Sequence, residues 1–150
     1  MAAKNNMEYV RHYPSLGNSG PRISKINVGA MSFGPKKWQE RVLEEDEALS
    51  LIKHAYKGGI NTFDTADIYS HGVSEEIVGK ALKKYSIPRH LVVIMTKCYF
   101  GVDNNGKMLP ILFCGRNYGD WVNRVGHSRK HIFDAVDASI ERSRTYIDVL

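Results

Sequence analysis

Three polar side chains with complementary chemistry follow predicted strands of this chain. Asp64 and Tyr69 stand five residues apart in the segment GINTFDTADIYS, and Lys97 ends the apolar run LVVIMTK. A tyrosine hydroxyl can protonate a developing alkoxide at neutral pH, and a lysine ammonium beside it makes that proton easier to release. An aspartate would hold the lysine charged and in place. The set therefore predicts a proton-transfer site formed by Asp64, Tyr69 and Lys97.

Each of these residues also has an ordinary structural interpretation when it is taken alone. Asp64 can be a loop carboxylate or a cap, Tyr69 a half-buried aromatic at a rim, and Lys97 a solvated strand end. Their joint position after successive strands favours the catalytic interpretation, because the carboxyl ends of parallel strands meet at one edge of a sheet. Gly29, Ala30 and Met31 follow the strand before them and are expected at the same edge.

Five further residues carry chemistry without forming a pattern. His71 lies in a polar loop and is expected to face solvent, so we assign it no role. His127 and His131 flank a predicted helix start and are also expected at the surface. Trp38 and Trp121 lie in loops, where they either line a substrate pocket or anchor those loops.

The elements that must position the site begin with a predicted β-hairpin over residues 8–28. Its strands, 9–13 and 23–28, flank the turn-rich segment LGNSGP at 16–21. Beyond it, segments with the apolar period of an amphipathic helix, each ended by helix-terminating residues, alternate with short β-branched or apolar runs typical of strands. Three helices are predicted at 44–57, 74–85 and 128–142, and three strands at 60–64, 91–97 and 146–150.

Particular residues are expected to begin or end these helices and to turn one helix face toward the core. Gly58 ends the first helix, while Ser74 and Ser128 are predicted to cap the second and third. The third helix is expected to bury its large apolar side chains, which are Ile132, Phe133, Val136 and Ile140. Residues 98–127 form a connection far longer than usual, and such loops are generally functional or mobile.

The alternation of strands and helices predicts an α/β fold with a parallel sheet. No GxGxxG fingerprint follows the first strand and no Walker lysine is present, which disfavours a doubly wound nucleotide-binding fold. We expect one domain over residues 1–150. Residues 23–150 then form the first half of a (β/α)8 barrel, with the hairpin before it.

The composition excludes several other classes of protein. The longest apolar run, at 91–95, is far shorter than the ~20 residues of a membrane-spanning helix, so no membrane partner is expected. The net charge of +5 lies entirely in residues 76–150, where the excess basic residues are spread singly rather than clustered, which disfavours nucleic acid as a partner. Two cysteines are too few and too widely spaced for a zinc pattern, so no metal site is expected. The N-terminus lacks the apolar core of a secretory signal, and we expect a cytoplasmic protein.

The segments that carry the predicted site also resemble a known family. GINTFDTADIYSHGVSEEIVGKALKK, followed by VVIMTK, is similar to the aldo-keto reductases. KINVGAMSFG, KCYFGVD and SRKHIFDAVDASIER resemble its fungal aryl-alcohol-dehydrogenase-like members, and the likeness covers residues 8–150. It implies a (β/α)8 barrel that binds NADPH and passes hydride to an aldehyde or ketone. By motif position it implies Tyr69 as the general acid and Asp64 with Lys97 as the pair that tunes it. Gly29, Ala30, Met31 and Asp64 would lie beside the nicotinamide.

The chain departs from the family pattern in two places. It stops at IDVL, before the histidine and the later strands that the resemblance would supply. We therefore expect a truncated domain that binds NADPH weakly or not at all, has no reductase activity alone, and self-associates through open barrel edges. The alternative is a non-catalytic half-barrel that serves as an interaction module. Ser143 and Arg144 stand where relatives usually carry Leu-Gly, so Arg144 would adopt a left-handed backbone at a cost of about 1 kcal/mol.

Overall fold

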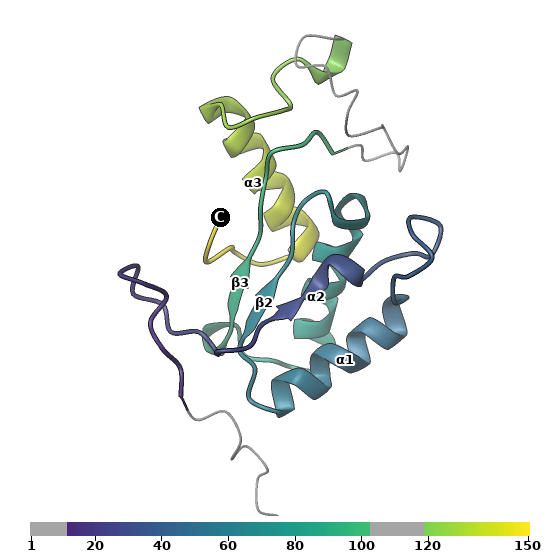
Figure 1. Cartoon of the computed structure of the whole chain (residues 1–150). Coiled ribbons are helices and arrows are strands. Elements are labelled where there is room, and N and C mark those ends of the chain that lie inside the picture. The colour runs from purple at the N-terminus through teal and green to yellow at the C-terminus, as the bar shows by residue number, and fades with distance from the viewer. Residues whose placement is uncertain (1–11, 103–118) are drawn as a thin grey trace, which may run out of the picture.

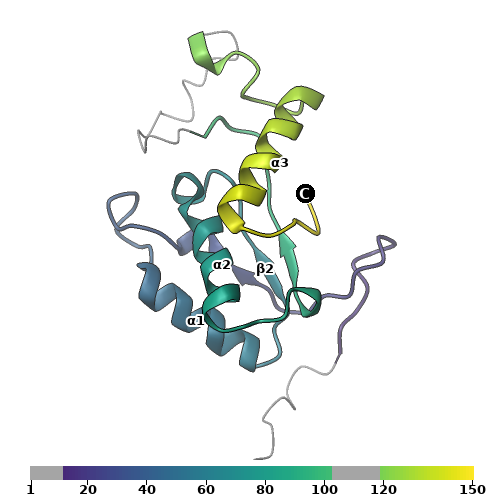
Figure 2. The same cartoon turned by 180° about the vertical axis from the view of Figure 1, so that it is seen from behind.

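The computed structural model describes residues 12–102 and 119–150 of the chain. Its strands form one parallel sheet in the order β1-β2-β3, and helices connect them. The helices lie on one face of the sheet, as the two opposite views show (Figures 1 and 2). This arrangement confirms the predicted parallel α/β fold. The bounds of the elements are β1 Val28–Gly29, α1 Glu45–Lys57, β2 Thr62–Asp64, α2 Val73–Lys84, β3 Val93–Met95 and α3 Arg129–Ser143.

The register of the sheet brings the carboxyl ends of the strands to one level. Gly29 of β1 pairs with Asp64 of β2, which in turn pairs with Met95 of β3. Residues 146–150, predicted as a further strand, run parallel to β3 but form only one bridge, between Met95 and Val149. The edge that carries the predicted site is therefore continuous across the described strands.

The core fills the space between the sheet and the first two helices. Leu49 and Ile52 of α1, together with Ile77 and Val78 of α2, are buried against Phe63 of β2. The apolar residues of α1 and α2 recur at helical spacing, so each helix turns one apolar face to the core. Acidic residues in the first turn of α1 and basic residues in its last turn also suit the helix dipole.

The N-terminal hairpin is less regular than predicted. One antiparallel bridge joins Ser15 to Arg22, and residues 23–27 form no strand. Ser24 explains the difference, because its hydroxyl donates to the carbonyl of Ile26 at 2.7 Å and its backbone N–H donates to the side chain of Asn61 at 2.7 Å. Such side-chain bonds compete with a strand ladder. Residues 8–11 of the predicted hairpin lie outside the described residues, as does most of the long connection, 103–118.

Ser74 does not cap α2 as predicted. The helix begins one residue earlier, after Gly72, and Ser74 is completely buried inside its first turn. Its hydroxyl lies 2.7 Å from the carbonyl of Ala30 and 2.9 Å from the hydroxyl of Thr65. The residue therefore ties α2 to the ends of β1 and β2 instead of closing the helix terminus.

The predicted buried face of α3 is only partly right, because two of its four residues, Ile132 and Val136, are half-buried and the other two are exposed. Phe133 and Ile140 are 54% and 39% exposed, and the residues that α3 buries are His131, Ala135, Ser139 and Ser143. Small side chains are required here because α3 crosses α2 closely, and a Cβ added at Gly79 would stand 2.0 Å from the carbonyl oxygen of Ser143. Both predicted ends of α3 are confirmed: Ser128 caps it, and Arg144 closes it with a left-handed backbone at φ 54°.

Candidate active site

Asp64 and Lys97 meet at the carboxyl edge of the sheet. Asp64 is the last residue of β2, and Lys97 follows β3 by two residues. The ammonium of Lys97 lies 2.7 Å from a carboxylate oxygen of Asp64 and donates to the carbonyl of Thr65 at 2.8 Å. Both side chains remain accessible, since 51% of Lys97 and 30% of Asp64 is exposed. The pair can therefore contact a molecule bound at this edge.

Tyr69 joins the pair through a strained turn. The ammonium of Lys97 lies 5.3 Å from the centroid of the Tyr69 ring. The two residues after Tyr69, Ser70 and His71, both have positive φ values, 50° and 54°. The hydroxyl of Ser70 donates to the carbonyl of Phe33 at 2.8 Å, which holds this turn against the loop after β1. Strained backbone of this kind persists only where its surroundings hold it, and it is concentrated at functional sites.

The last residue of β1 and the residues that follow it form an open wall beside Asp64. Gly29 is exposed, and a Cβ added there would meet no atom within 4 Å. Met31 is 42% exposed, whereas Ala30 is fully buried and its carbonyl accepts the hydroxyl of Ser74. Gly29 and Met31 thus leave room for a flat ring next to Asp64, which fits a nicotinamide. Ala30, being fully buried, exposes no side chain at this edge.

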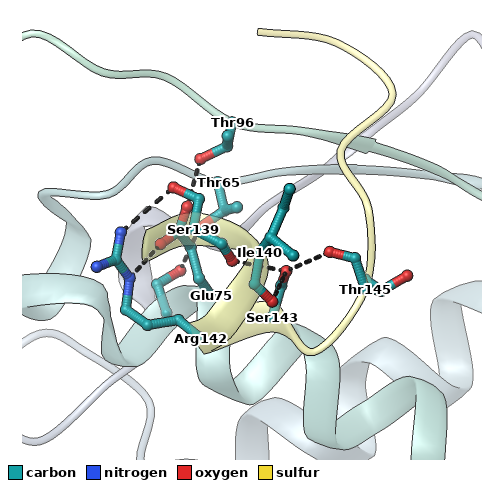
Figure 3. Close-up of polar contacts among 9 residues, drawn as sticks. Thr65, Glu75, Thr96, Ser139, Ile140, Arg142, Ser143 and Thr145 are labelled. Carbon is teal, nitrogen blue, oxygen red and sulfur yellow. Dashed lines mark hydrogen bonds and ion pairs between the residues drawn. The ribbon is translucent and has the colours of Figure 1, made fainter. Parts of the chain in front are cut away.

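A buried ion pair supports this edge from behind. One carboxylate oxygen of Glu75, on α2, accepts the hydroxyl of Thr96 at 2.6 Å, and the other accepts Nε of Arg142, on α3, at 2.6 Å. Figure 3 shows Glu75 between these two partners. Thr96 directly precedes Lys97, so the network fixes the strand end that carries the lysine. Sequence reasoning missed it, although Glu75 shares the buried face of α2 with Val78, a position where a carboxylate needs a partner.

A second buried carboxyl, Asp67, lies two residues before Tyr69 in the chain. Its pKa is raised to about 7, first by burial and second by the nearby charge of Glu75, while Arg142 opposes the shift. A cavity of about 150 Å³ adjoins it, lined also by His131 and Arg124. Burial likewise raises the pKa of the Cys98 thiol, with a smaller contribution from Asp67.

The other histidines and tryptophans do not join the trio. His131 is only 5% exposed, and one ring nitrogen lies 2.7 Å from the carbonyl of Gly126, so its predicted surface position is wrong. His127 is exposed, as predicted, and one of its ring nitrogens lies 3.1 Å from the carbonyl oxygen of Cys98. The ring nitrogens of His71 are buried and without a hydrogen-bond partner, which contradicts the expected solvent-facing position.

The two tryptophans are half-buried, and for Trp121 the structure favours an anchoring role. A Cβ added at Gly101 would stand 2.5 Å from the Trp121 ring, and the guanidinium of Arg124 lies 4.7 Å from its centroid. The ring therefore packs between the two ends of the long connection.

Two classes of feature are absent from residues 12–102 and 119–150. No three histidine, cysteine, aspartate or glutamate side chains there approach one another closely enough to hold a metal ion. None of the helices in these ranges combines the length and the apolar character needed to cross a membrane.

Comparison with known proteins finds similar fungal sequences. The chain is 62% identical over 145 residues to versiconal hemiacetal acetate reductase of Aspergillus parasiticus, covering 96% of this chain and 41% of the relative. It is 48% identical over 147 residues to a Schizosaccharomyces pombe protein named "Putative aryl-alcohol dehydrogenase", covering 92% of this chain and 41% of that protein. The chain thus spans about two fifths of the length of these relatives.

A solved structure and a family model are also similar to this chain. An aldo-keto reductase from Bacillus halodurans, in its holo form, superposes with a TM-score of 0.68 at 31% identity, covering 91% of this chain and 39% of the other. The fold described above is therefore part of a (β/α)8 barrel. The model of the aldo/keto reductase family matches residues 25–150. Most of the chain matches, and its fungal relatives are aryl-alcohol-dehydrogenase-like, so the chain belongs to the aldo/keto reductase family.

Proposed function

We propose that this chain carries the proton-donating and nicotinamide-facing part of an NADPH-dependent reductase of aldehydes or ketones. The observation that supports the proposal most directly is the position of the Lys97 ammonium, 2.7 Å from the Asp64 carboxylate and 5.3 Å from the centroid of the Tyr69 ring. An acid, an amine and a carboxylate that share one accessible edge can deliver a proton to an oxygen bound there.

Each of the three residues Tyr69, Lys97 and Asp64 has one role in this reaction. Gly29 and Met31 would hold the nicotinamide of NADPH, which when bound would supply the hydride for reduction of a carbonyl carbon. The hydroxyl of Tyr69 gives its proton to the carbonyl oxygen, so the C=O group becomes an alcohol. The Lys97 ammonium stabilises the tyrosinate that remains, because opposite charges attract strongly at short range. Asp64 holds that ammonium in position.

The relatives support a carbonyl substrate attached to an aromatic or similarly bulky group. One is named as a reductase of a hemiacetal and another for aryl alcohols. A hemiacetal is in equilibrium with an open aldehyde, and an aryl alcohol is the reduction product of an aryl aldehyde. We therefore propose an aryl aldehyde as the substrate class. The cytoplasmic location expected from the sequence stays a prediction.

Two forms of the protein test the proposal. In the first, residues 1–150 replace the matching part of the Aspergillus parasiticus relative, and NADPH oxidation is followed with 4-nitrobenzaldehyde. We expect this chimera to be active and its Tyr69→Phe variant to lose a factor of about 100 or more in kcat. Tyr56→Phe, which removes a hydroxyl from α1, serves as the matched control and leaves kcat unchanged. An active Tyr69→Phe chimera would contradict the assigned role.

The second form is the 150-residue chain by itself. We expect no NADPH oxidation above the background of its Tyr69→Phe variant, because reaction requires the nicotinamide and the carbonyl to be held within about 3–3.5 Å. Turnover that disappears in the Tyr69→Phe variant would show that the part of the barrel present here suffices.

A second candidate function, an interaction module, has one specific observation in its favour. Phe133, Ile140, Tyr146 and Leu150 are each 39–54% exposed on α3 and the segment after it. We propose that a second copy of the chain covers this apolar surface when the chain is present alone, since exposed apolar patches favour association. Sedimentation at several concentrations tests it. A monomer that unfolds cooperatively at micromolar concentration would contradict self-association.

A further inference from the structure

A cavity of about 620 Å³ lies outside the predicted active site. It is bounded by α1, by the second half of α2 and by the turn that follows α3. Figure 2 shows these three segments on the helical side of the sheet, with the turn after α3 passing close to α2. Neither Asp64, Tyr69 nor Lys97 lines it. The cavity is therefore a feature that the proposed reductase chemistry does not use.

The cavity combines an apolar floor with a cationic rim. Leu49, Leu82 and Ile87 form the floor and are at most 8% exposed. One carboxylate, that of Glu45, faces several basic side chains. The basic residues that line the cavity are Lys80, Lys83, Lys84, Arg89 and Arg144.

Part of this positive charge is neutralised within the fold. Lys80 forms an ion pair with Glu45 at 2.8 Å, so the charge of the carboxylate in the cavity is balanced by this lysine. Arg89 donates to the carboxylate of Asp148 and lies with its guanidinium 3.7 Å from the centroid of the Tyr146 ring. These two cations are held by partners from the chain itself.

The remaining cations have little or no compensation. Lys84 approaches Asp46 only at 3.9 Å, and the Asp46 side chain is 97% exposed, so this pair is weak. Within the described ranges, Lys83 and Arg144 form no ion pair with any carboxylate. The rim thus carries a surplus of positive charge beside a small apolar surface.

Arg144 occupies a backbone position that does not suit it. Its φ of 54° and ψ of 32° are left-handed, a conformation that glycine adopts without strain at the end of a helix. An arginine there is strained, and Arg144 is one of the residues that line the cavity. A strained residue that adds charge to a cavity is an observation from which a role in binding can be inferred.

We propose that this cavity binds an organic anion, a phosphate or carboxylate group joined to an apolar group. Arg144 and Lys83 bind the anionic group, and Leu49, Leu82 and Ile87 cover the apolar group. The proposal does not rest on the reductase function, because it shares no residue with the Asp64, Tyr69 and Lys97 site.

Binding is measured by calorimetry on the 150-residue chain, with phenyl phosphate and phenylacetate as probes. Inorganic phosphate tests the anionic group alone, and benzyl alcohol tests the apolar group alone. We expect the better of the two organic anions to bind at least about tenfold more tightly than either single-feature probe. Whichever of phenyl phosphate and phenylacetate binds more tightly identifies the anionic group as a phosphate or a carboxylate. If inorganic phosphate bound as tightly as the better organic anion, the proposal would be overturned.

Two variants and a matched control locate the site. Arg144→Gly and Lys83→Gln are each expected to weaken binding by about fivefold or more, whereas Lys25→Gln, which removes the same charge from an exposed loop, leaves it unchanged. Arg144→Gly also relieves backbone strain, so its melting temperature should rise by about 2–4 °C while its affinity falls. Unchanged affinity in both cavity variants, or an equal loss in Lys25→Gln, would contradict the proposed site.

Discussion

The carboxylate of Glu75 and the guanidinium of Arg142 form an ion pair in the interior, 67 residues apart in the chain, with a distance of 2.6 Å between Oε2 and Nε. No part of the Glu75 side chain is exposed, and only 14% of the Arg142 side chain is. The pair joins α2 to α3, and Thr96 extends it to the end of β3. It is therefore a direct link between the packing of the helices and the strand end that carries Lys97.

Removing one partner of this pair should destabilise the protein strongly. In Arg142→Met the buried Glu75 carboxylate loses its counter-charge, and we expect the free energy of unfolding to fall by about 3–5 kcal/mol in urea denaturation. The double variant Glu75→Gln and Arg142→Met should be less destabilised than Arg142→Met alone. Lys130→Met breaks an exposed pair on the same helix, with Asp134, and should cost at most about 0.5 kcal/mol. If Arg142→Met and Lys130→Met lowered the free energy of unfolding equally, the result would contradict the buried pair.

Stability should fall with rising pH because of Asp67. Its pKa is raised from 3.8 to about 7 in the folded protein, so between these values the folded state binds more protons than the unfolded state. The free energy of unfolding therefore decreases as pH rises from about 4 to about 7. Asp67→Asn removes this decrease and should be more stable than the wild type at pH 8.

A matched carboxyl variant separates this effect from other titrations. Asp137→Asn removes an exposed carboxyl from α3, and its pH profile of unfolding should run parallel to that of the wild type. A profile of Asp67→Asn that also runs parallel to the wild type would show that Asp67 is not the responsible group.

Glycine at position 79 is required by the contact of α2 with α3. The Cβ of Gly79→Ala would stand 2.0 Å from the Ser143 carbonyl oxygen, so the helices must separate. We expect a loss of about 1–3 kcal/mol in the free energy of unfolding. Gly29→Ala, where the added atom meets nothing within 4 Å, should change stability by at most about 0.5 kcal/mol. Similar stabilities of the two variants would contradict the close crossing.

Ser128 should stabilise the start of α3. Its hydroxyl oxygen accepts the backbone N–H of His131 at 3.1 Å, and the first turn of this helix contains no acidic residue. Ser128→Ala is expected to cost about 1 kcal/mol in urea unfolding, because the cap is lost. Ser50→Ala, in the exposed middle of α1, should instead be neutral or slightly stabilising. A neutral Ser128→Ala variant would argue against the cap.

Local sequence patterns predicted the elements that position the candidate site. The helical period of α1 and α2 identified their buried faces, and short apolar runs bounded by glycine or proline identified β2 and β3. Strand ends follow from such punctuation, so Asp64 and Lys97 could be assigned to one edge before their 2.7 Å contact was known. The left-handed backbone of Arg144 was predicted for the same reason, since helix termination is a local event.

The outer packing of the chain could not be predicted in this way. The largest apolar residues of α3 suggested a buried face, but the close crossing at Gly79 selected its small residues and left Phe133 exposed. Ser24 and Ser74 likewise form bonds to segments distant in the chain, which ended a predicted strand and displaced a predicted cap.

The amino-acid sequence by itself determined the type and order of the elements and the edge where Asp64 and Lys97 stand, because helical period, strand length and turn residues act over a few neighbouring positions. Only the tertiary structure decided that Glu75 is paired with Arg142 and that Asp67 is buried beside them. A charge inside a protein is stable only with a partner that the fold brings from elsewhere, and no local pattern specifies that partner.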